Sequence, residues 1–232
     1  MRRVHLGYLG PTIVFGGITA LGFFLAQRRA KKLKFFQQEE LEVSQVKQPG
    51  VAKVHGVVVP VQPLQSPLGG KPVVWYRMLV QEYVKAGRYS RWATIHDEAV
   101  GVPFQLKDRK GPGAIEVNPA GAEVLLHAEG GSEDFGTLVR YLESRGIKRM
   151  LGFGELRANE TTLSPGEKIF VLGTVVQGPT GYSMQKAKSP FVLSDTDSGQ
   201  VAYKESSAMY VTRFWAGAAG LMTLWWLWHL VR

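Results

Sequence analysis

Cysteine is absent from this sequence of 232 residues. Its absence excludes disulfide bonds, thiolate zinc sites, iron–sulfur clusters and cysteine nucleophiles from these residues. The redox compartment stays open, because a chain without cysteine is compatible with either state.

Histidine is sparse, and its five residues are scattered along the chain. They are His5, His55, His96, His127 and His229. No pair has a metal-ligand spacing such as H-x-x-x-H. The run His96-Asp97-Glu98 would suit a metal or acid–base site, but it falls at the predicted end of a strand, where a polar turn is the favoured interpretation. We therefore predict no catalytic residue, no metal and no cofactor.

The common phosphate-binding and nucleophile motifs are missing as well. Gly152-Phe153-Gly154 lacks the third glycine of a dinucleotide-binding loop. Gly178-Pro179-Thr180-Gly181 lacks the lysine of a P-loop and is more typical of a hairpin turn. No G-x-S-x-G nucleophile elbow occurs.

Charged residues are missing from two long apolar runs, Leu6–Ala26 and Phe214–Val231. A helix needs about 20 apolar residues to cross a bilayer, so we predict two transmembrane helices. The first run is longer than the apolar region of a signal peptide, and basic residues follow it, which favours a retained anchor. A buried core helix is the alternative for the second run. Aromatic residues near both of its ends favour a membrane interface: Tyr210, Trp215, Trp225, Trp226 and Trp228.

Basic residues are concentrated beside the first run, and we expect them to contact anionic lipid head groups. They are Arg28, Arg29, Lys31, Lys32 and Lys34. Nine of the 28 basic residues lie at or outside the edges of the two runs. The other 19 equal in number the 19 acidic residues of the middle domain, which is therefore formally neutral. This distribution argues against a nucleic-acid partner despite a net charge of +9. The bias of Lys and Arg places the middle domain in the cytoplasm and both termini outside.

The middle of the chain is predicted to be mainly β, of the α+β class, as an antiparallel β sandwich or partly open barrel with one short helix. About ten short strands are expected. Val73–Val80 and Ser90–His96 form a predicted antiparallel hairpin around Gly87, and Thr137–Arg145 is the predicted helix, with Gly146 past its end. The expected organisation is a transmembrane helix over 6–26, a basic juxtamembrane helix or linker over 27–50, the β domain over 51–195, a juxtamembrane helix over 196–213 and a second transmembrane helix over 214–231.

Two further helical segments are expected outside the strands. Phe35–Gln48 has helix-compatible spacing and is predicted to continue the first helix out of the membrane until Pro49-Gly50 ends it. A helix is predicted to run from about Gln200 into the second span. Pairs of small residues four positions apart in both spans, such as Gly16 with Ala20, permit helix pairing within one chain or between chains.

Several short motifs recur in a fixed order between the two apolar runs. They are Val54-His55-Gly56-Val57-Val58, Ser66-Pro67-Leu68, Val74-Trp75-Tyr76-Arg77, the segments 102–108 and 117–122, Glu160 with Leu163-Ser164-Pro165-Gly166-Glu167, Val171-Leu172-Gly173 and Pro190-Phe191-Val192-Leu193-Ser194. On these motifs the segment 51–194 resembles the GIDE family, also called the BAM (beside-a-membrane) domain. The resemblance implies a domain between two spans that engages substrates, joined in organelle members to a C-terminal RING of a ubiquitin ligase.

The sequence departs from the ligase pattern, because a RING needs a series of Cys and His zinc ligands. With no cysteine and an end at Arg232, the chain resembles a prokaryotic two-span form of the inner membrane, and we expect no ligase activity of its own. Three hypotheses remain: a membrane-anchored module that binds a membrane-protein partner, a substrate-recruiting component of a ubiquitin transferase with a separate catalytic subunit, and an oligomeric membrane scaffold. Trp75, Tyr76 and Trp92 are the candidate partner contacts, although packing within the hairpin core is the favoured explanation for them.

Overall fold

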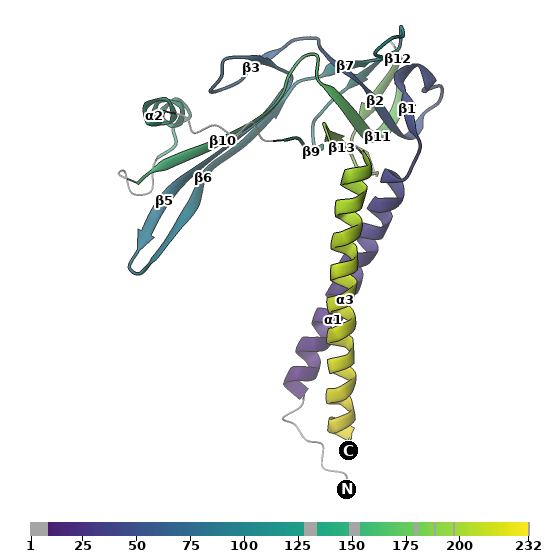
Figure 1. Ribbon diagram of the computed structural model, residues 1–232, viewed down its shortest axis with the longest axis vertical. Helices are drawn as coiled ribbons and strands as arrows, with labels where there is room; N and C mark the ends of the chain where they lie inside the picture. The colour runs from purple at the N-terminus through teal and green to yellow at the C-terminus, as the bar shows by residue number, and fades with distance from the viewer. Residues whose placement is uncertain are drawn as a thin grey trace. The chain divides into compact units, whose positions relative to one another are not determined.

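The computed structural model describes residues 9–127, 134–148, 154–178, 181–187, 189–196 and 198–231 (Figure 1). The chain divides into two compact units. One unit combines Met1–Gln38 with Ser198–Arg232, and the other is Glu39–Asp197.

The helical unit is a pair of long helices, α1 (Leu9–Phe36) and α3 (Ser198–Val231). They pack closely because small residues face each other: a Cβ added to Gly22 would lie 2.9 Å from the Cβ of Ala216. The predicted helix from about Gln200 is confirmed as α3. The small-residue pairing occurs within the chain, whereas pairing between chains stays a prediction.

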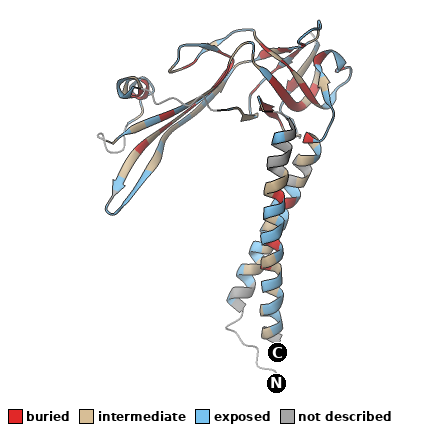
Figure 2. Cartoon of the chain, viewed as in Figure 1, coloured by how far each residue is buried: buried red, intermediate tan, exposed pale blue. Residues whose placement is uncertain are grey.

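Many residues of both helices are exposed (Figure 2), and they include large apolar ones. Ile13, Phe23, Phe214 and Leu224 are between 63 and 70% exposed. Over the described residues, however, no helix combines the length and the apolar character that a membrane crossing requires. The described parts of the two predicted spans, 9–26 and 214–231, are thus helical, whereas their assignment as transmembrane segments is not supported.

The β unit contains a closed barrel of five strands, in which the first strand pairs with the last. The barrel strands are β2 (Gly50–Pro60), β7 (Phe104–Lys107), β8 (Ala114–Val117), β12 (Gly181–Gln185) and β11 (Lys168–Gly178), and β2 closes the ring on β11. The strands β1 (Glu40–Glu42), β13 (Val192–Ser194) and β9 (Glu123–Leu125) extend this sheet, and β3 (Leu64–Gln65) pairs with β4 (Pro72–Val73). Alternate side chains fill the barrel, with Val54, Phe104, Leu106 and Val171 fully buried.

This barrel differs in two ways from the sequence-based expectation. Its ring is closed rather than partly open, because eight consecutive residues of β2 pair with β11, which is more than 100 residues later in the chain. It is also not wholly antiparallel, since β12 pairs with β8 in parallel within the ring, and the added strands β1 and β13 form parallel pairs with β2 and β9. Pairing between distant segments leaves no local sequence signal. Composition and alternation alone therefore favoured an antiparallel sandwich or a partly open barrel.

A second, three-stranded sheet projects from the barrel within the same unit (Figure 1). Its order is β10 (Leu156–Leu163), β5 (Trp75–Ala86) and β6 (Tyr89–Gly101), all antiparallel. The predicted hairpin is therefore confirmed as β5–β6. Helix α2 (Phe135–Ser144) buries Leu138, Tyr141 and Leu142 in the core cluster beside this sheet.

Helix α2 has well-defined ends that the sequence signals. The Asp134 side chain caps its start by accepting the Thr137 backbone N–H. Gly146 ends it with a φ of +67°, while the N–H groups of Gly146 and Ile147 donate to the carbonyls of Glu143 and Leu142. This is a Schellman motif, which explains why the predicted helix over 137–145 is observed within two residues.

The segment after α1 corrects the sequence-based expectation. The helix ends at Phe36 instead of continuing to Gln48, and β1 and the 3-10 helix η2 (Val43–Gln45) follow. Asp108 explains the change, because its carboxylate accepts the backbone N–H groups of Val43 and Ser44 at 2.6 and 3.0 Å. Val43 is then buried in the barrel core, which a continued helix would not allow.

Candidate functional site

The three-stranded sheet has one covered and one open face, and its backbone alternation decides which side chain lies on which. Successive residues of a strand point to opposite faces. Tyr76, Met78 and Val80 are buried in the cluster that contains α2, and they define the covered face. Arg77 and Gln81, of opposite parity on β5, define the open face.

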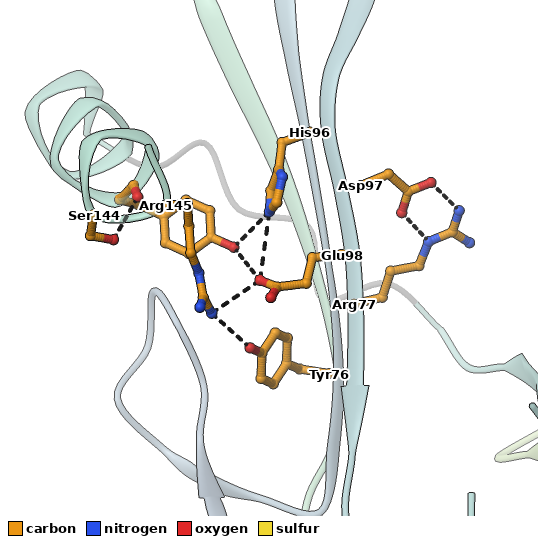
Figure 3. Close-up of polar contacts among 8 residues, drawn as sticks. Tyr76, Arg77, His96, Asp97, Glu98, Ser144 and Arg145 are labelled. Atoms are coloured by element: carbon orange, nitrogen blue, oxygen red, sulfur yellow. Dashed lines mark hydrogen bonds and ion pairs between the residues drawn. The ribbon is translucent and has the colours of Figure 1, made fainter. Parts of the chain in front are cut away.

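The covered face holds a polar cluster that joins β5, β6 and the end of α2 (Figure 3). The Tyr141 hydroxyl lies 2.9 Å from Glu98 Oε2, to which it donates, and 3.0 Å from His96 Nε2. Arg145 Nη2 lies 3.0 Å from the same Glu98 oxygen and donates to the Tyr76 hydroxyl at 3.1 Å. One carboxylate thus fixes the position of α2 over the sheet.

The two phenols of this cluster are hydrogen-bonding groups rather than bases. Burial, together with the hydrogen bond to Glu98, raises the pKa of Tyr141 to about 12. Burial, with the nearby Glu98 charge, also raises the pKa of Tyr76. Both phenols are therefore protonated near neutral pH and can donate to a carboxylate.

The run His96-Asp97-Glu98 is not a polar turn, and this corrects the sequence-based interpretation. Strand β6 continues through all three residues to Gly101, so His96 and Glu98 join the covered face while Asp97 points to the open one. Across the described part of the chain, no group of three His, Cys, Asp or Glu residues could hold a metal ion. The arrangement instead orients α2.

Asp97 is part of an ion pair on the open face. Arg77 donates to both of its carboxylate oxygens at 2.8 Å (Figure 3). These hydrogen bonds lower the pKa of Asp97. The side chains are 52 and 41% exposed, so the pair contributes little to stability and is accessible to a partner.

The three predicted partner contacts lie in different environments. Trp75 is 8% exposed and belongs to the barrel core, and Tyr76 is 5% exposed and belongs to the polar cluster. Trp92 is half-buried on β6. The structure therefore does not bring the three together, and Trp92 alone among them lies on the open face.

Trp92 is surrounded by side chains from all three strands of the sheet. The Arg157 guanidinium lies 4.3 Å from the centre of its ring, a cation–π geometry, and the Tyr83 ring lies 5.3 Å away. Gln81 accepts a hydrogen bond from Arg157 at 2.8 Å and donates to Thr94. We call these five residues, with Arg77 and Asp97, the open-face cluster.

A shallow depression lies next to this cluster between β5 and β10. It has a volume of about 280 Å³ and is lined by Leu79, Gln81, Arg157, Ala158 and Asn159. Sequence reasoning missed Arg157 because its strand pairs with β5 from more than 70 residues away. The one sequence signal was the alternation of polar Arg157 with apolar Ala158, which places the two side chains on opposite faces of a strand.

The predicted lipid contacts lie on α1 and α3. Arg28 lies over the Phe24 ring at 4.5 Å, and Lys34 is exposed near the end of α1. Tyr210, Trp215, Trp225 and Trp228 are between 56 and 65% exposed, whereas Trp226 is half-buried and packs edge-on against Trp225. The side chains of Arg29, Lys31 and Lys32 lie outside the described residues. So do Leu6–Tyr8 of the first predicted span, Gly152 and Phe153, and Pro179 and Thr180.

Comparison with known proteins gives one match. The model of the GIDE family, described as E3 Ubiquitin ligase, matches residues 77–225. The match runs from β5 into α3, so it begins later and ends later than the resemblance over 51–194. No curated protein and no solved structure matches the chain. The family model covers well over half of the sequence, and the chain belongs to the GIDE family.

Proposed function

We propose that this protein is a non-catalytic module which binds a protein partner at a membrane, and that the open-face cluster is the contact surface. The observation that carries the proposal is the asymmetry of the three-stranded sheet. One face is packed against the cluster of α2, whereas the other presents Trp92, Tyr83 and Arg157. Tryptophan, tyrosine and arginine are the residues that most often dominate binding energy at protein interfaces.

The open-face cluster is pre-organised, which favours binding. Arg157 is held by Gln81 and by the Trp92 ring, and Tyr83 donates to Ser90 at 2.7 Å. Fixing these side chains before binding removes part of the entropy cost that an interface otherwise carries.

Membrane anchoring is supported by the exposed apolar surface of the helix pair. Both helices point large apolar side chains outward, including Phe23, Phe214 and Trp215. Exposed apolar surface of this extent is typical of contact with lipid or with another protein. The 21 residues of Leu6–Ala26 without charge and the basic tract from Arg28 to Lys34 are consistent with an anchor whose flank meets anionic lipid. Both helices are proposed to lie in an inner membrane, with the β unit in the cytoplasm.

The partner-binding proposal predicts that the amount of partner that co-purifies with the chain depends on Trp92. The full chain is purified from detergent extracts as wild type, Trp92→Ala and Trp92→Phe, and co-purified proteins are quantified by mass spectrometry. We expect a reproducible partner that Trp92→Ala loses by about tenfold or more, as a hot-spot residue would. Trp92→Phe retains a ring beneath Arg157 and is expected to retain most of the partner.

Two results would contradict this proposal. One is equal recovery of every co-purified protein by all three variants. The other is a loss that Trp92→Phe and Trp92→Ala share while both variants unfold at a lower temperature than wild type, which would assign the effect to folding.

A second candidate function follows from the description of the family model. In this form the chain recruits substrates for a ubiquitin transferase whose catalytic subunit is separate. The 232 residues supply no thiolate for a RING zinc site. Purified protein with conjugation enzymes is therefore expected to transfer ubiquitin only after a zinc-bearing partner is added. Transfer by the chain alone would contradict both the first proposal and this one.

A further inference from the structure

The β5–β6 hairpin extends beyond the rest of its sheet (Figure 1). Strand β10 begins at Leu156, which pairs with Glu82. Tyr83 still donates its backbone N–H to the Glu155 carbonyl at 2.8 Å. Over the described residues, β5 and β6 pair only with each other from Val84 to the turn, in three residue pairs that end at Ala86 and Tyr89. At about 3.3 Å per residue, this ribbon reaches roughly 10 Å past its last contact with the third segment.

The turn itself is built for a tight reversal. Gly87 has a φ of +62°, and Arg88 completes a two-residue loop between the paired residues Ala86 and Tyr89. Glycine at the first position with positive φ is typical of a type II′ hairpin turn. The reversal leaves Tyr89 at the tip, 84% exposed, the highest exposure among the large hydrophobic side chains described.

The hairpin tip, defined as residues 85–91, is basic on a domain whose total charge is balanced. Lys85, Arg88 and Arg91 are all exposed. No acidic residue occurs between Tyr83 and Ile95. Within the described part of the chain, none of the three cations forms an ion pair. The next acids along β6 are paired with other cations: Asp97 with Arg77 and Glu98 with Arg145.

We propose that the hairpin tip binds the surface of a bilayer that contains anionic phospholipid, with Tyr89 among the head groups and the three cations on their phosphates. Exposed cations gain favourable energy near an anionic leaflet, and tyrosine is enriched at the membrane–water interface. The proposal rests on the proposed function only in that anchoring by α1 and α3 keeps a bilayer close to the domain.

A nucleic acid fits the tip less well. Proteins that bind nucleic acid through its phosphates usually present an extended basic patch or stripe. Here three cations are confined to one turn, and the remaining domain contributes no excess of positive charge. An exposed tyrosine at a protruding tip is also the geometry of a shallow insertion rather than of a groove.

The absence of cysteine allows a direct test. Tyr89→Cys gives the full chain a single thiol, which is labelled with an environment-sensitive fluorophore. The labelled chain is reconstituted into vesicles of phosphatidylcholine alone or with phosphatidylglycerol. We expect the emission to shift to the blue and to rise severalfold only with phosphatidylglycerol, and the change to be lost in high salt.

Two charge variants on the labelled chain separate a specific tip from general charge. In the first, Lys85, Arg88 and Arg91 are changed to Gln, which is expected to abolish the emission change. In the matched control, Lys107, Arg109 and Lys110 are changed to Gln. These three cations are also exposed and flank the β7–β8 turn, and we expect this variant to behave like the parent.

The possible outcomes distinguish this proposal from the failure of membrane anchoring. Equal emission in both kinds of vesicle, or equal loss in both charge variants, would overturn the lipid-binding tip. An emission change caused by single-stranded RNA but not by anionic vesicles would overturn it in favour of nucleic acid. If the chain fails to float with neutral vesicles, anchoring by the helices fails, while the response to anionic vesicles still reports on the tip.

Discussion

At the scale of single residues, Glu98 connects the covered face to helix α2. Its Oε2 atom lies within 3.0 Å of both the Tyr141 hydroxyl and the Arg145 guanidinium. A carboxylate of this kind, with its side chain only 25% exposed, is stable there because a cation and a hydroxyl replace the lost water. The cluster therefore specifies where α2 lies over the covered face.

Removal of one hydroxyl tests this role. Tyr141→Phe deletes the donor to Glu98, and we expect a loss of about 1–2 kcal/mol in the free energy of unfolding, since the carboxylate stays part-buried. Tyr83→Phe is the matched control, because the Tyr83 hydroxyl meets Ser90 on an exposed face and its loss is expected to cost less than about 0.5 kcal/mol. Urea denaturation followed by circular dichroism measures both. Equal losses would assign no special role to the covered face.

The raised pKa of Tyr141 also predicts an alkaline dependence of stability. A group whose folded pKa exceeds its unfolded value stabilises the fold fully below the unfolded pKa, here about 10, and loses this contribution as pH rises toward 12. We expect the unfolding temperature to fall between these values in the wild type and to fall less in Tyr141→Phe. Absorbance at the tyrosinate band measures the ionisation of Tyr141 directly, by comparison of the wild type with Tyr141→Phe. Ionisation of Tyr141 at the same pH as the exposed tyrosines would contradict its raised pKa.

At the scale of elements, local signals predicted what local interactions determine. Helix α2 carries its own cap and its own terminal glycine, and the β5–β6 hairpin carries its own turn at Gly87, so both were predicted from the sequence. The closed barrel and β1 depend on contacts between distant residues, such as Asp108 with Val43, and these have no local pattern. Arg157 of the open-face cluster was missed for the same reason.

The pairing of α1 with α3 gives a test at this scale. Gly22→Leu forces atoms into the space of Ala216, where even a Cβ would lie at 2.9 Å, and overpacking of this kind typically costs about 1–3 kcal/mol. Gly17→Leu is the matched control, because nothing lies within 4 Å of an added Cβ there. Each is combined with Gly16→Cys and Thr223→Cys, which the helix pair brings together, and the rate of disulfide formation is measured.

The expected outcome is slower cross-linking for Gly22→Leu alone. Gly17→Leu should leave the rate unchanged, because no described atom lies within 4 Å of a Cβ added there. Fast cross-linking in both variants would show that the helices tolerate the larger residue, and the small-residue face would lose the role assigned to it.

At the scale of the whole molecule, the chain combines a helix pair with an apolar exterior and a β unit with two surfaces of different chemistry. The open-face cluster is aromatic and largely internally paired, which suits a protein partner. The hairpin tip is basic and unpaired over the described residues, which suits anionic lipid. Net charge alone concealed this division, because the β unit is neutral in sum although its hairpin tip is basic.

The most direct test of the partner surface is site-specific photo-cross-linking in native membranes. A photoreactive amino acid replaces Asn159, which lines the depression of the open face, or Lys110, which is exposed on the β7–β8 turn. We predict that light produces one adduct of defined mass from position 159 and none from position 110. No adduct from position 159, or the same adduct from both positions, would contradict the assignment of the open face as the binding surface.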